Sequence, residues 1–428
     1  MNSESNEPLD TDQNPGSSSA PGDSSHSGPR TDWFRGRSLG EALLSRSNSL
    51  NLLRLILASV VVFSHSITIG GYGNEFVLHW TTPGSIAVFC FFGISGYLIA
   101  GSAGANRFGR YLWHRALRIL PAFWVCLVVV AFGISWLGWR HSGHHCGYLC
   151  YLRTPNGPLS YVVHNSALRI TQLSIPGTLR GAPFAFGWNG SIWTLFYEFL
   201  CYLVIGVLAM FGALRRRASI IIVAAAVWLL EIVVTSVPRL NSQFNGFHHW
   251  ELTNLLRFIP VFLVGSILYL YRERVPDSGW IALGSIAIML LTYLIPVGGG
   301  IPAVTLTRSD LSAVLLVYPM LWLGAHLPGR SIGAKNDYSY GLYIYAFPVA
   351  QILAVWGVYR WGYIPFTAMT FLFVAPLAIG SWWLVEKRCL RLKDLGLRTS
   401  PTGSEAAGGG APDHAVGDSG ITSPVAPS

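Results

Sequence analysis

The chain contains very little charge. Only 11% of its 428 residues are charged, whereas 51% are hydrophobic, and the mean hydropathy is +0.44. A soluble domain carries about 25% charged residues. This deficit excludes a soluble protein and predicts an all-α, polytopic membrane protein. Residues 139–190 form the longest stretch outside the apolar runs, so no soluble domain of useful size is expected.

Several motifs of other protein classes are also absent. The chain has no GxxxxGK[ST] phosphate loop and no glycine-rich loop between a strand and a helix, so no nucleotide-hydrolysis site is indicated. We find no internal repeat, which disfavours a transporter built from inverted halves.

Ten apolar runs have about the 17–25 residues that a helix needs to cross a bilayer. They cover residues 50–69, 84–103, 118–138, 191–213, 218–236, 252–271, 279–296, 310–326, 339–357 and 364–385. Most Lys and Arg residues fall in loops on one side, which places both termini in the cytoplasm. The net charge of +9 therefore reflects orientation and contact with anionic headgroups, and no nucleic-acid partner is expected.

The two ends of the chain differ from the middle in composition. Residues 1–47 are rich in Ser, Asn, Gly, Pro and Asp and lack an apolar run. They are expected to form a disordered cytoplasmic tail, not a signal peptide. Residues 396–428 are expected to form a second disordered tail, which leaves 48–395 as the membrane domain.

Two ionisable residues, Arg54 and His65, lie in the first apolar run. Eleven helical steps of about 100° return to within roughly 20° of the start, so both share one face about 16 Å apart. Such groups usually face a bundle interior or a wet cavity. A histidine suits a general base and an arginine suits a phosphate or an acid. A packed histidine with a snorkelling arginine is the alternative.

Further candidates lie in the next runs. Ser95 and Gly96 are small enough to admit a ligand, although plain helix packing explains them equally well. Arg115 and Arg118 face the same way at the cytoplasmic mouth, where they suit a polyanionic cofactor or simply set the orientation. Glu198 lies within the fourth run and needs a partner, for which Arg or His from other helices are the obvious candidates.

One loop outside the apolar runs is rich in potential ligands. It contains His141, His144, His145, Cys146 and Cys150. Histidine and thiolate bind zinc, but this spacing matches no standard site. A disulfide or an ordinary loop is favoured, and no metal is expected.

These residues together resemble the acyltransferase-3 family of integral membrane acyltransferases. The marks are an Arg–ten residues–His pair, FFGISGYLI, an Arg-x-x-Arg pair followed by Ile and Pro, Ser-x-Trp-x-Leu-x-x-Glu, and YSYGLYIYAFPV. They occur in the family's order over about residues 48–395. One departure is Ala346, which stands where family members often carry a histidine.

The resemblance implies a ten-span core in the inner (plasma) membrane that takes an acyl group, by default acetyl, from cytoplasmic acyl-CoA. The acceptor would be a hydroxyl of a surface glycan or a glycolipid intermediate. His65 would be the base or acyl relay, and Glu198 would position or charge-balance the site. The donor-binding residues would be Arg54, Arg115, Arg118, Ser95 and Gly96.

Two alternatives to this function remain open at the level of the sequence. The first is a glycan or lipid transporter, or flippase, without covalent chemistry, because polar residues within spans suit it equally. The second is an acyltransferase that modifies a small-molecule natural product and so differs only in its acceptor.

Overall fold

The computed structural model describes residues 36–44, 48–73, 75, 81–145, 147–236, 250–294, 302–333 and 335–394. Within these ranges all regular structure is helical apart from one isolated bridge between Ser38 and Pro276. The prediction of an all-α protein is therefore confirmed. Most of the two expected tails, 1–35 and 395–428, and Cys146 lie outside the described residues.

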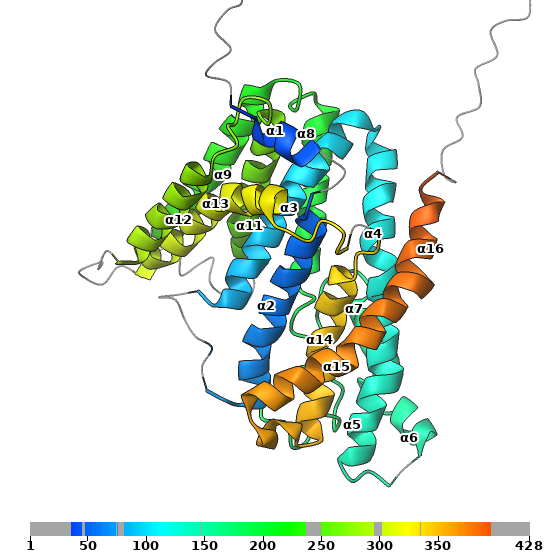
Figure 1. Cartoon of the computed structure of the whole chain (residues 1–428). Helices are drawn as coiled ribbons and strands as arrows, with labels where there is room; N and C mark the ends of the chain where they lie inside the picture. The colour runs from blue at the N-terminus through cyan, green and yellow to red at the C-terminus, as the bar shows by residue number, and fades with distance from the viewer. Residues whose placement is uncertain are drawn as a thin grey trace, which may run out of the picture.

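The helices form one bundle (Figure 1). In chain order the α-helices are α1 (Leu39–Leu44), α2 (Leu50–Gly70), α3 (Pro83–Ala105), α4 (Phe108–Val129), α5 (Ser135–His141), α6 (Tyr148–Leu152), α7 (Pro158–Asn165), α8 (Thr194–Met210), α9 (Arg217–Ser236), α11 (Trp250–Leu270), α12 (Gly279–Leu294), α13 (Pro302–His326), α14 (Ser339–Val355), α15 (Tyr363–Ser381) and α16 (Lys387–Leu390). Shorter turns are the π-helices η2 (Val130–Ile134) and η4 (Trp382–Glu386) and the 3₁₀ helices η3 (Val358–Trp361) and η5 (Arg391–Asp394).

Six helical segments of the described chain are long and apolar enough to cross a membrane. They are Leu50–Gly70, Pro83–Ala105, Phe108–His141, Arg217–Val234, Glu251–Leu270 and Tyr363–Lys393. Shorter apolar helices, Thr194–Met210, Gly279–Thr292, Ala313–His326 and Ser339–Val355, occupy the other predicted positions. The membrane character is thus confirmed, whereas the described residues do not establish all ten predicted spans.

Helix α14 forms the centre of the bundle. All of its residues are buried, and it packs against α2 and α15 and also touches α4. Figure 1 shows it between α2 and the long α4. A helix that is apolar on every side must be surrounded, which explains why YSYGLYIYAFPV lacks an exposed polar face.

Helices α3 and α11 cross at very short range. A Cβ added to Gly96 would lie 1.9 Å from the carbonyl oxygen of Phe262, and one added to Gly265 would lie 2.0 Å from that of Gly93. The Ser266 hydroxyl donates to the Gly96 carbonyl at 3.1 Å. Small residues allow backbones to approach in this way. Packing therefore accounts for the glycines of FFGISGYLI.

The link between α2 and α3 is set by local chemistry. Helix α2 ends at Gly71, whose φ of +69° is left-handed and favours glycine. Helix α3 begins with Thr82, whose hydroxyl accepts from the Ser85 N–H at 3.2 Å, followed by Pro83 in the first turn.

Two predicted spans are longer than expected. The third begins at Phe108 and continues through a π turn to His141, so Arg110, Arg115 and Arg118 lie on the helix itself. The tenth continues past Ser381 through η4. Such π turns are rare and often mark functional sites. The π turn η4 contains the buried Glu386.

The expected N-terminal tail is shorter than predicted, because residues 36–44 fold against the bundle. Ser38 and Glu41 form a reciprocal cap: each side chain accepts from the other's backbone N–H, at 3.2 and 2.9 Å. Leu39 and Leu43 are buried where α1 packs on α13. Burial of these leucines stabilises a segment whose overall composition predicts disorder.

Candidate active site

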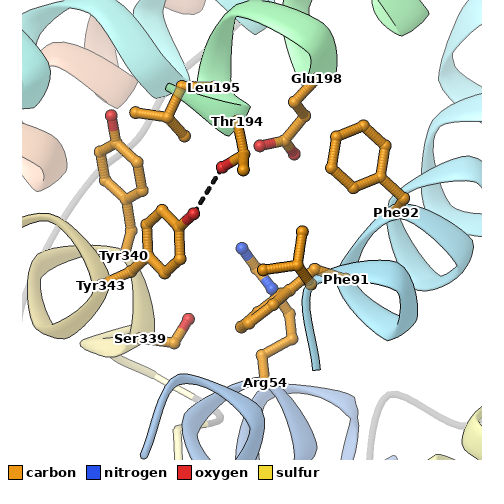
Figure 2. A pocket seen from close by; sticks show the side chains of 10 residues that line it. Arg54, Phe91, Phe92, Thr194, Leu195, Glu198, Ser339, Tyr340 and Tyr343 are labelled. Carbon is orange, nitrogen blue, oxygen red and sulfur yellow. Dashed lines mark hydrogen bonds between the residues drawn. The ribbon is translucent and has the colours of Figure 1, made fainter. Parts of the chain in front are cut away.

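A cavity lies between α2, α3, α8 and α14 (Figure 2). Arg54 points into it from α2 and Glu198 from α8, while Phe91 and Phe92 of α3 and Tyr343 of α14 contribute aromatic walls. We call this space the arginine cavity. The prediction that Arg54 faces the bundle interior is confirmed, and its side chain is 20% exposed.

Glu198 is held in this cavity by hydroxyl groups. The Ser95 hydroxyl donates to its Oε1 at 3.1 Å, and the Tyr202 hydroxyl donates to the same oxygen. Within the described residues no ion pair joins Glu198 to an arginine or a histidine, so the expected charged partner is replaced by two neutral donors. Ser95 thus belongs to the site, whereas Gly96 faces α11.

His65 lines a second cavity of about 250 Å³, which we call the histidine cavity. Trp193, Arg257 and Phe258 also line this space. Because α2 is continuous, His65 lies about 16 Å further along the helix axis than Arg54. The His65 ring meets Phe347 edge-on, with 5.3 Å between centroids. The histidine therefore faces the bundle interior, as predicted.

Glu75 is the charged neighbour of His65. Its Oε1 is 3.8 Å from His65 Nδ1, an ion-pair distance longer than a direct hydrogen bond. The Thr68 hydroxyl donates to the same oxygen at 3.0 Å, and the Ser64 hydroxyl donates to Oε2. Burial raises the pKa of Glu75, but the interactions with His65, Ser64 and Thr68 outweigh it and lower the pKa to about 2.

Glu75 is therefore ionised at neutral pH and next to the imidazole. A carboxylate beside Nδ1 fixes the tautomer of a histidine and stabilises its protonated form. Our sequence reasoning missed this residue because it lies between two apolar runs. The available signal was that Glu75 is the only acidic residue in the link 71–82.

A network of arginines and carboxylates lies at the other end of α2. Arg54 Nη1 is 2.7 Å from Asp337 Oδ2, and Arg118 Nη2 contacts the same oxygen. Arg118 Nη1 also lies 3.3 Å from Glu386 Oε2, and the Ser381 hydroxyl donates to Glu386 at 3.1 Å. The structure thus brings two predicted donor-binding arginines to one carboxylate.

Asp337 lies in the link before α14. Burial raises the pKa of Asp337, but the charges of Arg54 and Arg118 and hydrogen bonds from Ser339 hold it well below its usual range. Neither Asp337 nor Glu386 was identified from the sequence. Asp337 lies in a short link, and Glu386 lies one residue beyond the predicted end of the last span.

Arg115 is placed differently from Arg118. Its Nε is buried and has no hydrogen-bond partner within the described part of the chain. Arg115 lies three residues before Arg118 on α4, and neither of the two side chains lines the arginine cavity.

The Ser-x-Trp-x-Leu-x-x-Glu motif connects the two cavities. Ser191 and Trp193 line the histidine cavity, whereas Leu195 and Glu198 line the arginine cavity. Ser191 precedes α8, and Glu198 lies in its second turn. The first half of the motif therefore lines one cavity and the second half lines the other.

The similarity to known proteins agrees with this geometry. Residues 47–386 match the acyltransferase domain of the acyltransferase-3 family. The chain belongs to this family. It is 29% identical over 351 residues to an O-acetyl transferase of Shigella phage Sf6, which covers 81% of this chain and 97% of the relative. It is 26% identical over 371 residues to Nodulation protein 10 of Rhizobium leguminosarum bv. viciae, covering 81% and 94%. No solved structure matches significantly.

Family membership makes this chain an acyltransferase, so a transporter without covalent chemistry is no longer the appropriate alternative. The family departure at Ala346 lies beside the site. Ala346 and His65 line one narrow space, so a longer side chain at 346 would project toward the histidine.

The loop after α5 is held by a disulfide and by a stacked histidine ring. Cys150 is disulfide-bonded, which confirms the disulfide interpretation for this residue; Cys146 lies outside the described residues. The His144 ring stacks on Trp139 with 3.7 Å between centroids. Among the described residues no group of three His, Cys, Asp or Glu side chains converges as a metal site.

Proposed function

We propose that this acyltransferase moves an acyl group, by default acetyl, from cytoplasmic acyl-CoA to a hydroxyl of a surface glycan or glycolipid intermediate. The observation that carries the proposal is the placement of Arg54 and His65 on one face of α2, in two adjoining cavities. The name of the phage relative, an O-acetyl transferase, supports acetyl as the group and oxygen as the acceptor atom.

The proposed topology has ten spans in the inner membrane with both termini in the cytoplasm. The concentration of Lys and Arg in alternate loops supports it. In this orientation Arg54, Arg115 and Arg118 lie at the cytoplasmic end, where acyl-CoA is available. His65 lies toward the outer leaflet, close to a surface acceptor.

The donor would bind through its phosphates. Arg54 and Arg118 are already neutralised in part by Asp337 and Glu386, whereas Arg115 has an unpartnered buried Nε. Guanidinium groups form charge-assisted hydrogen bonds with phosphate. Arg115 therefore retains a donor position for a phosphate oxygen, and Asp337 fixes the orientation of Arg54.

In the transfer step His65 would act as the general base. Its Nδ1 faces Glu75, which leaves Nε2 for the acceptor hydroxyl. His65 removes the hydroxyl proton as the oxygen attacks the thioester carbonyl; the carbon–sulfur bond breaks, and the CoA thiolate leaves with the proton from the imidazolium. Glu75 stabilises the imidazolium, while Glu198 organises Ser95 and Tyr202 along the donor's path.

The test compares membranes that contain wild type, His65→Ala, His164→Ala or vector, with radiolabelled acetyl-CoA and an envelope glycan fraction. His164 is an exposed histidine that lines neither cavity, so it serves as the matched control. General-base catalysis contributes about 10²–10⁴-fold, and His65→Ala should lose about this factor in label transfer and CoA release. Normal glycan labelling by folded His65→Ala protein would refute the mechanism; label in a small molecule instead would refute the proposed acceptor.

A further inference from the structure

The arginine and histidine cavities share a wall. Val88, Thr194 and Tyr343 line both of them. Tyr343 also lines the narrow space beside His65, and among the described residues it is the one side chain common to all three spaces. A tyrosine in the second turn of the buried α14 thus lies between the two halves of the site.

Tyr343 is held across this wall by the start of α8. Its hydroxyl shares a hydrogen bond with the Thr194 hydroxyl, drawn in Figure 2, and donates to the Ser191 carbonyl at 2.7 Å. Tyr343 and Thr194 are 8% and 6% exposed, so the contact is closed to bulk water. Phe91 meets the Tyr343 ring at 6.1 Å between centroids.

This wall lies on the route that the reaction requires. In the proposed function the donor's phosphates bind near Arg54, whereas the acceptor hydroxyl meets the thioester beside His65, about 16 Å away along α2. The arm that carries the acyl group must therefore pass Tyr343. Hydrogen bonds between uncharged groups cost little to break in exchange for others, so this contact is suited to opening and closing.

We propose that Tyr343 and Thr194 form a gate between the arginine cavity and the histidine cavity. The gate opens when the acyl-bearing arm enters and closes behind it. This inference rests on the proposed function for its purpose. When the gate is closed, water from the acceptor side is kept from the thioester, where its attack would give a free carboxylic acid and CoA thiol.

Thiol accessibility tests the gate independently of any acyl chemistry. Ser85 is exposed and lines the histidine cavity, so Ser85→Cys in a Cys389→Ser background places a reporter there. A small charged methanethiosulfonate reagent is added to the cytoplasmic face of sealed vesicles, and the labelling rate is followed. One hydrogen bond changes an equilibrium about two- to tenfold. Tyr343→Phe should raise the rate by about that factor, and Tyr343→Ala by more.

Tyr345→Phe is the matched control, because Tyr345 is buried on the same helix but lines none of the three cavities. It should label like the parent. Thr194→Val removes the Thr194–Tyr343 bond but leaves the bond from Tyr343 to the Ser191 carbonyl, so it should raise the labelling rate by less than Tyr343→Phe does. Equal labelling rates in the parent and in folded Tyr343→Phe, Tyr343→Ala and Thr194→Val proteins would overturn the gate.

The second readout is coupling between CoA release and acyl transfer. With acetyl-CoA and acceptor, Tyr343→Phe should release about two- to tenfold more CoA per acyl group transferred than wild type. Unchanged coupling together with faster labelling would refute the role against hydrolysis while leaving the gate itself standing. If the membranes turn over no acyl-CoA, the proposed function fails, but the labelling rates still decide whether the two cavities are separated by Tyr343.

Discussion

The pairing of Arg54 with Asp337 allows a quantitative test of the network of arginines and carboxylates near the start of α2. Their closest atoms are 2.7 Å apart, and the side chains are 20% and 11% exposed. Removing one partner of a buried ion pair costs about 3–5 kcal/mol because the other charge is left unpaired. Arg118 retains its ion pair with Glu386 when Asp337 is replaced. We therefore expect Asp337→Asn to lower the free energy of unfolding by about 3 kcal/mol, the lower end of that range.

A double-mutant cycle separates the pair from other effects. Arg54→Gln and Asp337→Asn are measured singly and together by unfolding in mixed detergent and SDS micelles, followed by the fluorescence of the 16 tryptophans. Residues in direct contact show coupling of about 0.5–3 kcal/mol. We expect a value in the upper half of that range, so the double variant should lose much less stability than the sum of the single losses.

The Arg169–Glu251 pair is the matched control. Its side chains are 60% and 43% exposed, and exposed pairs contribute about 0–1 kcal/mol. Arg169→Gln and Glu251→Gln should therefore cost little and couple weakly, and added salt should reduce that coupling further. Additive losses at Arg54 and Asp337, or a coupling no larger than that of the exposed pair, would refute the buried network.

Two further predictions concern other parts of the molecule. Glu75→Gln removes the charge beside His65, and we expect the kcat of acyl transfer to fall about 10- to 100-fold with little change in the KM for acyl-CoA. Because the pKa of Glu75 is lowered to about 2, its contribution to stability is complete above its ordinary pKa and is lost only as pH falls toward 2; unfolding of wild type and Glu75→Gln between pH 2 and 6 measures it. Gly96→Ala forces a methyl group against the Phe262 carbonyl and should cost about 1–3 kcal/mol of stability. Gly109→Ala, where a Cβ meets nothing within 4 Å, should be neutral in the same unfolding assay.

Much of the fold follows from the sequence because membrane spans are long and apolar. Each of the ten predicted runs contains an apolar helix. The errors lie at the ends: α4 begins ten residues before the predicted 118, and the last span continues to Asp394. Hydropathy locates the apolar part of a helix. The helical backbone hydrogen bonds continue beyond that part, through the polar turns that contain Arg110 and Arg115.

The candidate site was predictable only in part. Arg54 and His65 stand out because ionisable side chains are rare in apolar runs. Their partners Asp337 and Glu75 lie in links, where a single carboxylate is unremarkable in sequence. Gly96 was ambiguous from the outset, since the same small side chain serves a ligand or a neighbouring helix; only the position of α11 resolves it.

These partners reveal a rule about how the chain places charge in the membrane. An unpaired charge within the bilayer costs several kcal/mol, so a functional charge must be balanced before substrate arrives. Helix α2 carries the two candidate site residues toward opposite ends, and each meets a carboxylate from a link: Asp337 for Arg54 and Glu75 for His65. A carboxylate in a link costs less than one within a span wherever the link lies outside the hydrocarbon. The site is therefore assembled from one helix and two links, and the ionisable residues of a span cannot be interpreted without the links at each end of it.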